Sequence, residues 1–258
     1  MKNIALVMTS NLLHKNKYID TLIKDNIESI NLLIELKFRN PNTSFIKHNI
    51  TYLNLIGFRG FLYVVFLYYT RAKEKLFKPN EDHQLLTLEE ISKKYNLDFE
   101  IIDSVNSGKF KKLIFDKEID YVINSGNQIY NKKTLDSLDA KIINRHTSLL
   151  PEYGGIYPVF WQMLNDENYG GVTLHWIDEE IDKGKIAYQQ KFNIHRDISL
   201  FENYKTAFKI SLNLCNELIQ DLNNGIEKTK DLKEKGSYYS WPTRSEVKKF
   251  KRKKLKIV

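Results

Sequence analysis

An asparagine and a histidine stand two residues apart at the end of an apolar run, KIINRH at 141–146. Residues two apart on a strand face the same side, so Asn144 and His146 are expected to project into one site while Arg145 points the other way. An imidazole exchanges a proton near neutral pH, and an amide can donate a hydrogen bond to a developing oxyanion. The pair suits acyl transfer, although such residues at strand ends often only satisfy backbone groups.

A second polar group lies in the loop of GVTLHWIDEEIDKGKIAYQ, residues 171–189. Its carboxylates are Asp178, Glu179, Glu180 and Asp182. A carboxylate beside an imidazole favours the charged form, so this loop could orient the histidine or raise its pKa. Composition leaves a solvated acidic turn or a weak cation site equally open. The spacing differs from that of a calcium loop and no Cys/His cluster has zinc spacing, so no metal is expected.

The other histidines and the single cysteine are less informative. His175 draws more interest because it lies on the strand that enters the acidic loop. Surface or core positions are expected for the scattered histidines, which are His14, His48, His83 and His195. Cys215 is the only cysteine, so no internal disulfide can form, and its apolar neighbours predict a core position. This cysteine usage fits a cytoplasmic protein.

Short apolar runs and amphipathic segments alternate along the chain and must position these residues. Strands are expected at 1–9, 29–37, 99–103, 120–126, 141–146, 171–177 and 185–194. Helices are expected at 18–27, 58–76, 87–96, 109–117, 134–139 and 200–222, with 39–54 irregular. This alternation predicts an α/β fold, a Rossmann-like and mostly parallel sheet flanked by helices. Ligands then gather at the carboxyl ends of the strands, where 120–126 and 141–146 end in polar residues.

Length and charge set the broad class. The chain has 258 residues and a net charge of +8, and KKFKRKK at 248–254 carries much of the excess. We expect a main domain over 1–195 and a C-terminal helix with a basic, aromatic extension over 196–258. A basic surface suits nucleic acid, a membrane or a phosphorylated small substrate.

The most apolar stretch is FLYVVFLYY at 61–69. Its length is about half of what a membrane span requires, so no integral membrane segment is expected. We interpret it as part of a buried or interfacial helix, with peripheral membrane contact as the alternative.

The run INRHTSLLPEYGG, followed by PVFW and GVTLHWIDEEIDKGKIAYQ, resembles the 10-formyltetrahydrofolate-dependent formyltransferases. Their pattern is Asn-x-His-Pro-Ser-Leu-Leu-Pro, then Gly-Val/Thr-x-x-His, then Asp-x-Gly-x-Ile with a Gln. The resemblance is dense over 120–190 and loose over 1–120. It implies a catalytic trio of Asn144, His146 and Asp182. In such enzymes a primary amine attacks the formyl carbon, the Asn and imidazole stabilise the oxyanion, and the His, or water held by the Asp, removes the amine proton.

The resemblance also implies where the cofactor, 10-formyltetrahydrofolate, binds. The segment SGNQIY would bind the pterin largely through backbone groups, and the loop at 177–182 would form the other wall. The candidate cofactor-binding residues are Gln128, Ile129, Tyr130, Ile177 and Asp178.

This chain departs from the family pattern at two places. Thr147 follows His146 where the family usually has proline, which makes the turn less rigid. Tyr153-Gly154-Gly155 stands where many members have Tyr-Arg-Gly. If that arginine recognises the acceptor in the family, then either the acceptor of this protein differs or another of its residues recognises the acceptor. Tyr153 and Gly155 are therefore candidate substrate-binding residues.

Chain length favours one class of acceptor. Glycinamide ribonucleotide formyltransferases are typically shorter, and methionyl-tRNA formyltransferases carry a further β-barrel domain. The size resembles the sugar N-formyltransferases, which act on nucleotide-linked amino-deoxysugars during surface-polysaccharide synthesis. A dTDP-linked sugar is preferred on family frequency alone, and formylation of glycinamide ribonucleotide or methionyl-tRNA is the alternative.

The tail GSYYSWPTRSEVKKF offers further candidates for substrate binding. Tyr238, Tyr239 and Trp241 could stack on a base, and Arg244 or Lys248 could meet a pyrophosphate. Packing of these aromatic residues onto the main domain is equally open. A basic nucleic-acid-binding protein is a competing class, but the charge lies in one run without a recognised motif, so no nucleic-acid partner is expected. A homodimer is considered among the partners.

Overall fold

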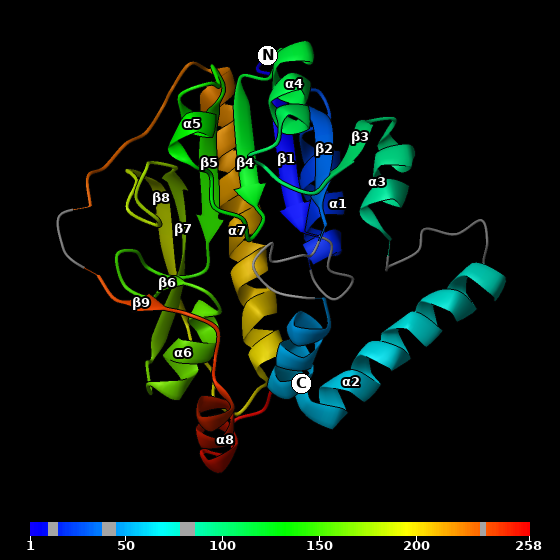
Figure 1. Cartoon of the computed structure of the whole chain (residues 1–258), viewed down its shortest axis with the longest axis vertical. Coiled ribbons are helices and arrows are strands. Elements are labelled where there is room, and N and C mark those ends of the chain that lie inside the picture. The colour runs from blue at the N-terminus through cyan, green and yellow to red at the C-terminus, as the bar shows by residue number, and fades with distance from the viewer. Residues whose placement is uncertain (10–14, 38–44, 78–85, 233–235) are drawn as a thin grey trace.

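The computed structural model describes residues 1–9, 15–37, 45–77, 86–232 and 236–258. Seven strands form one sheet (Figure 1). Their spatial order is β3 (Asp98–Ile102), β2 (Ile30–Leu36), β1 (Ile4–Thr9), β4 (Tyr121–Ser125), β5 (Lys141–His146), β7 (Tyr169–Trp176) and β8 (Ile186–Asn193). The strands β3 to β5 pair in parallel, whereas β5, β7 and β8 pair antiparallel. The predicted α/β class with a mostly parallel sheet is confirmed.

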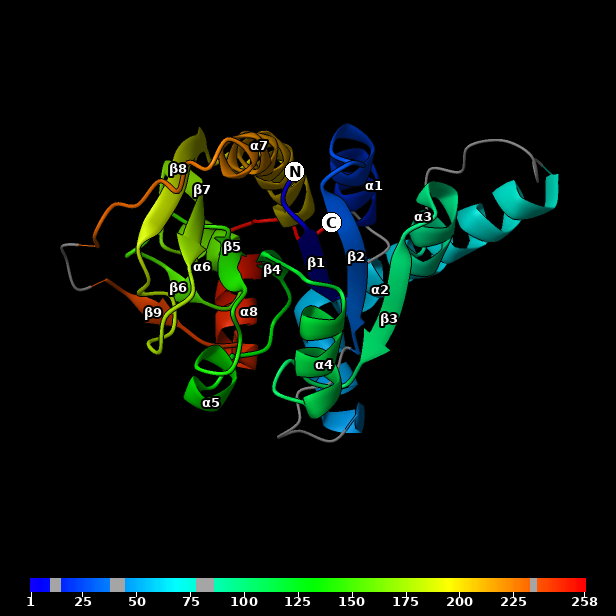
Figure 2. The same ribbon diagram turned by 90° about the horizontal axis from the view of Figure 1, so that it is seen from above.

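Helices cover both faces of the sheet (Figure 2). One face carries α1 (Lys15–Asp25) and α7 (Leu200–Asn223), and the other carries α4 (Gly108–Asp116) and the short α5 (Lys132–Leu135). The helix α3 (Leu88–Tyr95) is capped by Thr87, which forms a capping box with Glu90. The helix α5 starts two residues earlier than predicted, because Asn131 caps it by accepting a hydrogen bond from the Thr134 N–H.

The central strand β1 shows how the core is divided. Every residue of β1 is buried, as expected for a parallel strand covered on both faces. Leu6 and Met8 belong to the larger core cluster with α1 and α7, and Ala5 and Val7 belong to the smaller cluster with α4. Cys215 of α7 is buried in the larger cluster, as predicted.

The C-terminal segment packs onto this body. A two-residue strand β9 (Tyr238–Tyr239) pairs in parallel with β6 (Gly154–Gly155), next to α6 (Pro158–Leu164). The helix α8 (Arg244–Arg252) adds Val247 and Phe250 to the larger core cluster. The division between 1–195 and 196–258 remains a prediction.

The helix α2 (Phe45–Phe77) differs most from expectation. The segment predicted as irregular is helical from Phe45 to Asn54, while 39–44 lies outside the described residues. Gly57 interrupts α2 with φ 66° and ψ −175°, a conformation open essentially to glycine alone. The interpretation of 61–69 as buried is wrong, because Phe61, Leu62 and Phe66 are exposed. Within the described residues, no helix has the length and apolar character needed to span a membrane.

Candidate active site

Asn144 lies at the point where three strands meet. It pairs with Asn124 of the parallel neighbour β4 and with His175 of the antiparallel neighbour β7. The Asn124 Nδ2 donates to the Asn144 Oδ1 at 2.8 Å, and the Asn144 Nδ2 lies 3.1 Å from the His175 Nε2. Strand register therefore brings together three polar side chains that are far apart in sequence.

The orientation of both amides follows from the donors around Asn124. The Tyr130 hydroxyl and the Gly126 N–H both donate to the Asn124 Oδ1, each at 3.3 Å. Because this oxygen accepts, the other end of the Asn124 amide must donate, and it donates to Asn144. The Asn144 Nδ2 then faces His175 with one hydrogen. Within the described residues, its second hydrogen has no acceptor at hydrogen-bonding distance.

His175 is a site residue that sequence reasoning noted but left out of the candidates. Its imidazole is buried, and its Nδ1 lies 3.1 Å from the carbonyl oxygen of Trp176. A carbonyl can only accept, so Nδ1 carries the hydrogen and Nε2 can accept from Asn144. The signal in the sequence was its place on the strand that enters the acidic loop.

His146 is buried at the carboxyl end of β5, on the same strand face as Asn144. Its Nε2 donates to the carbonyl oxygen of Tyr153 at 2.8 Å, so the neutral ring keeps a lone pair on Nδ1. Burial lowers the pKa of His146, and this outweighs the opposing effect of Asp182. The expected effect of a loop carboxylate is present, because Asp182 raises this pKa, but burial sets the net direction. The ring is neutral at pH 7.

Asp182 lies between the two imidazoles. Its Oδ1 is 3.8 Å from the His146 Nδ1 and 3.5 Å from the His175 Nε2, and its Oδ2 accepts the Gly155 N–H at 2.7 Å. Burial raises the pKa of Asp182, but the neighbouring His175 and His146 imidazoles and the Gly155 N–H together lower it to about 2. The carboxylate is therefore ionised and can stabilise a proton taken up by either ring.

Gly155 can donate to Asp182 because it lacks a side chain. Its φ of 93° is in the region that favours glycine, and an added Cβ would lie 2.1 Å from the Tyr239 carbonyl oxygen. The pairing of β6 with β9 thus helps to hold the carboxylate.

The other acidic residues of the loop face solvent. Glu179 forms an ion pair with Lys132, Glu180 forms one with Lys183, and Asp178 is exposed. These three residues therefore form a solvated acidic turn, one of the alternatives that composition left open. In the described part of the chain, no group of three His, Cys, Asp or Glu side chains is placed to hold a metal ion.

The residues expected to bind the cofactor lie on two loops, and Lys132, which follows the first loop, forms an ion pair with Glu179 of the second. The Gln128 side chain accepts from the Val105 N–H at 3.0 Å and donates to the Asp103 carbonyl at 2.8 Å. Ile129 is 59% exposed, and Tyr130 is buried.

Ile177 and Asp178 begin the second of these loops. Ile177 packs against the smaller core cluster, and its N–H donates to the Ile142 carbonyl at 2.8 Å. Asp178 is exposed. The assignment of all five residues to folate binding stays a prediction.

The residues expected to bind substrate separate into two groups. Tyr239 stacks on Tyr153 at 5.1 Å and on Trp161 at 4.8 Å, and Trp241 meets Tyr157 edge-on at 5.0 Å. Tyr239 and Trp241 therefore pack onto the main domain, which was the alternative to stacking on a base.

Tyr238 and Arg244 stay exposed. Burial of the Tyr238 hydroxyl and the charge of Asp182 both raise the pKa of Tyr238, and its ring contacts the position where a Cβ on Gly155 would lie. Tyr238 therefore lies beside the site, and a substrate-binding role for this group stays a prediction.

Two polar residues near the trio, Arg145 on β5 and Gln189 on β8, make hydrogen bonds that support the fold. Arg145 points to the opposite face, as predicted, and donates to Ser125 at 2.8 Å and to Ser211 at 3.3 Å. The Gln189 side chain donates to the Leu150 carbonyl at 2.9 Å, which holds the turn after His146.

The scattered histidines do not join the site. His195 is exposed, while His14, His83 and the side chain of His48 lie outside the described residues.

Sequence comparisons find similarity to formyltransferases. Residues 103–209 match the family model for formyl transferase. A methionyl-tRNA formyltransferase of Finegoldia magna is 28% identical over 107 residues, which are 42% of this chain and 34% of that protein. The match therefore spans about a third of the length of that curated relative.

Solved structures resemble the chain over most of its length. An N-formyltransferase of Helicobacter canadensis, in complex with folinic acid and dTDP-3-aminofucose, aligns with a TM-score of 0.57 at 19% identity, covering 93% of this chain and 71% of that one. Glycinamide ribonucleotide transformylase 1 of Symbiobacterium toebii aligns with a TM-score of 0.61 at 13% identity, covering 90% and 94%. At such identities the likeness concerns the fold. The stretch that matches the formyl transferase family model, residues 103–209, contains Asn144, His146 and Asp182.

Proposed function

We propose that this protein transfers a formyl group from 10-formyltetrahydrofolate to a primary amine. One observation carries the proposal: an Asn144 N–H without an acceptor among the described residues lies beside a neutral imidazole and an ionised carboxylate. These are the groups that amine acylation requires, namely an oxyanion donor, a proton acceptor and a group that stabilises the resulting imidazolium.

Each residue of the trio has a distinct task in this proposal. The Asn144 amide donates to the formyl oxygen as negative charge develops there. The His146 Nδ1 takes a proton from the attacking amine and later returns one to the departing nitrogen. Asp182 stabilises the imidazolium in between, across 3.8 Å. When bound, 10-formyltetrahydrofolate supplies the electrophilic formyl carbon.

The two loops beside the site fit a flat ring such as a pterin. Each loop exposes an isoleucine, Ile129 at 59% and Ile181 at 43%. Lys132, which follows the first loop at the start of α5, forms an ion pair with Glu179 of the second loop. Exposed apolar side chains on adjoining loops suit the walls of a slot for an aromatic ring. Backbone groups of the same loops can donate to and accept from the ring edge.

The acceptor we propose is a nucleotide-linked amino-deoxysugar, with a dTDP-sugar preferred, in the synthesis of surface polysaccharide. The solved complex with dTDP-3-aminofucose supports this acceptor, because the similarity in fold covers 93% of this chain. The exposed Tyr238 and Arg244 suit a base and a diphosphate, and a net charge of +8 favours encounter with an anionic substrate.

Methionyl-tRNA is the second candidate acceptor, because a curated relative with sequence similarity bears that name. A substrate panel separates the candidates. It contains dTDP-, UDP- and GDP-linked amino sugars, glycinamide ribonucleotide and methionyl-tRNA, each with 10-formyltetrahydrofolate. We expect turnover on at least one sugar. Turnover only on methionyl-tRNA or glycinamide ribonucleotide would contradict the proposed sugar acceptor but would still support the proposed formyl transfer.

The trio is tested by comparing two carboxylates of one loop. Asp182→Asn and His146→Ala should each lower kcat by roughly 10²–10⁴-fold with little change in folate affinity. Glu180→Gln is the matched control, because Glu180 faces solvent and, among the described residues, pairs only with Lys183. It should retain wild-type turnover. Near-normal turnover of both trio variants would show that the assignment is wrong.

A further inference from the structure

The second half of α2 presents a broad apolar face to solvent. Phe58, Phe61, Leu62, Val65, Tyr69 and Leu76 are each between 45% and 74% exposed. Their spacing of three, four and seven residues places them on one side of the helix. Figures 1 and 2 both show this half of α2 projecting away from the sheet.

The opposite side of the same helix is held to the body. The Tyr63 ring contacts the Phe201 ring at 6.2 Å, Val64 packs against the larger core cluster, and Arg71 pairs with Glu90 at 2.8 Å. A surface helix normally turns its apolar face inward, whereas α2 turns large apolar residues outward. Exposed apolar patches of this kind mark interaction sites.

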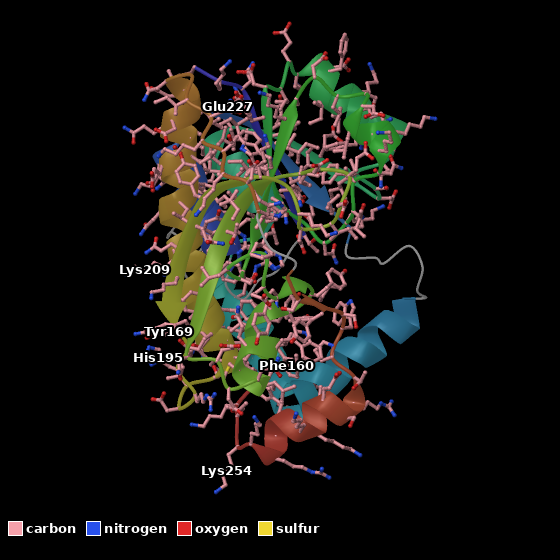
Figure 3. All side chains as sticks on the ribbon, turned by 90° about the vertical axis from the view of Figure 1, so that its left-hand side faces the viewer. Phe160, Tyr169, His195, Lys209, Glu227 and Lys254 are labelled. Carbon is pink, nitrogen blue, oxygen red and sulfur yellow. The ribbon has the colours of Figure 1, made fainter. Side chains whose placement is uncertain are left out.

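A basic helix adjoins the start of this face. The helix α8 contacts α2, and the Lys251 Nζ lies 3.1 Å from where a Cβ on Gly57 would stand, at the kink where the apolar half begins. Buried Val247 and Phe250 anchor α8. Its exposed cationic residues, with those that follow it, are Lys248, Lys249, Lys251, Arg252, Lys253 and Lys254. Figure 3 shows Lys254 extending from the end of the molecule that α8 forms.

We propose that the apolar face of α2 and the basic residues of α8 form a surface that docks on an anionic phospholipid bilayer. An apolar helix face buries itself at the boundary of headgroups and acyl chains, and nearby lysines bind anionic headgroups. The exposed Tyr68 and Tyr69 suit the headgroup level, where tyrosine is enriched. The protein would lie on the membrane without crossing it.

Charge favours a bilayer over a second copy of the chain. Two copies that paired through this face around a two-fold axis would each bring the same cationic α8 to the interface. The apolar residues buried between two copies would supply no anions to the lysines of α8 and just after it, of which only Lys253 has an acidic partner among the described residues, Asp166. An anionic lipid surface supplies both the apolar layer and the negative charge.

Sedimentation of the full chain with lipid vesicles tests the proposal. We expect binding to phosphatidylcholine vesicles containing phosphatidylglycerol, weaker binding to pure phosphatidylcholine, and a loss of binding as salt is added. The apolar variant Leu62→Glu/Val65→Glu and the charge variant Lys248→Glu/Lys249→Glu should each weaken binding about tenfold or more. Phe115→Glu is the matched control, because Phe115 is 78% exposed on α4, and it should bind like wild type.

Two results would overturn the proposal. One is wild-type protein that binds pure phosphatidylcholine as well as it binds vesicles with phosphatidylglycerol, or that binds neither. The other result is a wild-type dimer that the Leu62→Glu/Val65→Glu variant converts to a monomer in analytical ultracentrifugation, while the variant binds vesicles as well as wild type. This result would show that the apolar face binds a second copy of the chain. Far-ultraviolet circular dichroism and thermal melting establish whether each variant is folded. If one of the two double variants does not fold, the other still tests the proposal.

Discussion

Among single residues, Asn124 decides how the site is oriented, although the sequence analysis noted only the strand end at 120–126 that contains it. It accepts from the Tyr130 hydroxyl and the Gly126 N–H, and it donates to Asn144. This polarity directs the Asn144 amide hydrogens toward His175 and the site. Asn124 is therefore a positioning residue for the proposed oxyanion donor.

Substitution of Asn124 tests this role. Asn124→Leu removes the donor that holds Asn144, so we expect kcat to fall by up to about 100-fold while the KM for the amine changes little. Asn193→Leu is a control, because Asn193 is exposed and pairs with Tyr169 at the end of β8 that lies away from His175. Steady-state kinetics on the acceptor found in the panel provide the measurement. An unchanged kcat in Asn124→Leu would contradict the positioning role.

The pKa of His146 can be followed directly by NMR titration of the imidazole. Burial lowers this pKa below its ordinary value of about 6.5, and Asp182 opposes the effect. Asp182→Asn removes the charge that favours imidazolium, so the pKa of His146 should fall further in that variant. A higher pKa in Asp182→Asn would mean that the carboxylate does not act on this ring.

The same group links stability to pH. The unfolded chain binds a proton at His146 near pH 6.5, whereas the folded chain binds it only at lower pH, so stability rises with pH through this window. As the pH falls from about 7.5 toward about 5.5, the wild type should lose free energy of unfolding. His146→Gln should lose less over the same range, as measured by urea unfolding. Equal losses in the two proteins would contradict this linkage.

Among elements, α2 depends on one glycine for its shape. Gly57 has φ 66° and ψ −175°, and the atom nearest to an added Cβ is the flexible end of Lys251 at 3.1 Å. A side chain at residue 57 would therefore be disfavoured mainly by the backbone dihedral angles and less by a steric clash with Lys251. The kink turns the apolar half of α2 away from the half that precedes it.

Substitution of two glycines compares these effects. Gly57→Ala should lower the free energy of unfolding by about 1–3 kcal/mol, because alanine is strained in this region of φ and ψ. Gly108→Ala is the matched control at the start of α4, where an added Cβ meets nothing within 4 Å and φ is not in the positive region. Denaturant unfolding measures both variants. A neutral Gly57→Ala would imply that α2 adopts another path without strain.

For the whole molecule, the question is whether the C-terminal extension folds with the main body. Phe250 of α8 is fully buried and stacks on Phe160 of α6 at 4.7 Å. The label of Phe160 in Figure 3 marks this contact region between α6 and α8. The two-residue strand β9 adds hydrogen bonds from Gly154 and Ile156 to the tail. These contacts predict one cooperative unit.

Truncation of Phe250 tests this cooperativity. Phe250→Ala should lower the free energy of unfolding by about 3–5 kcal/mol while urea unfolding retains a single transition. Phe115→Ala, at a side chain that is 78% exposed, should have little effect. A first transition in which α8 alone detaches, followed by an unchanged main transition, would show that the extension is a separate unit.

The sequence by itself determined the seven strands of the main sheet, most of the helices and the position of Asn144 and His146 on one strand face. These features follow from periodicity, capping residues and the alternation of side chains, which act within a few residues. The resemblance over 120–190 added Asp182, and the structure places its carboxylate between two imidazoles.

Only the tertiary structure decided which distant residues complete the site and which faces stay exposed. Asn124 and His175 join Asn144 through strand register, a pairing between segments that no local pattern encodes. Tyr239 and Trp241 pack on the body because β9 pairs with β6, a contact across more than eighty residues of chain. The apolar face of α2 points outward because Tyr63, Val64 and Arg71 anchor its other side, and hydrophobicity alone does not specify direction.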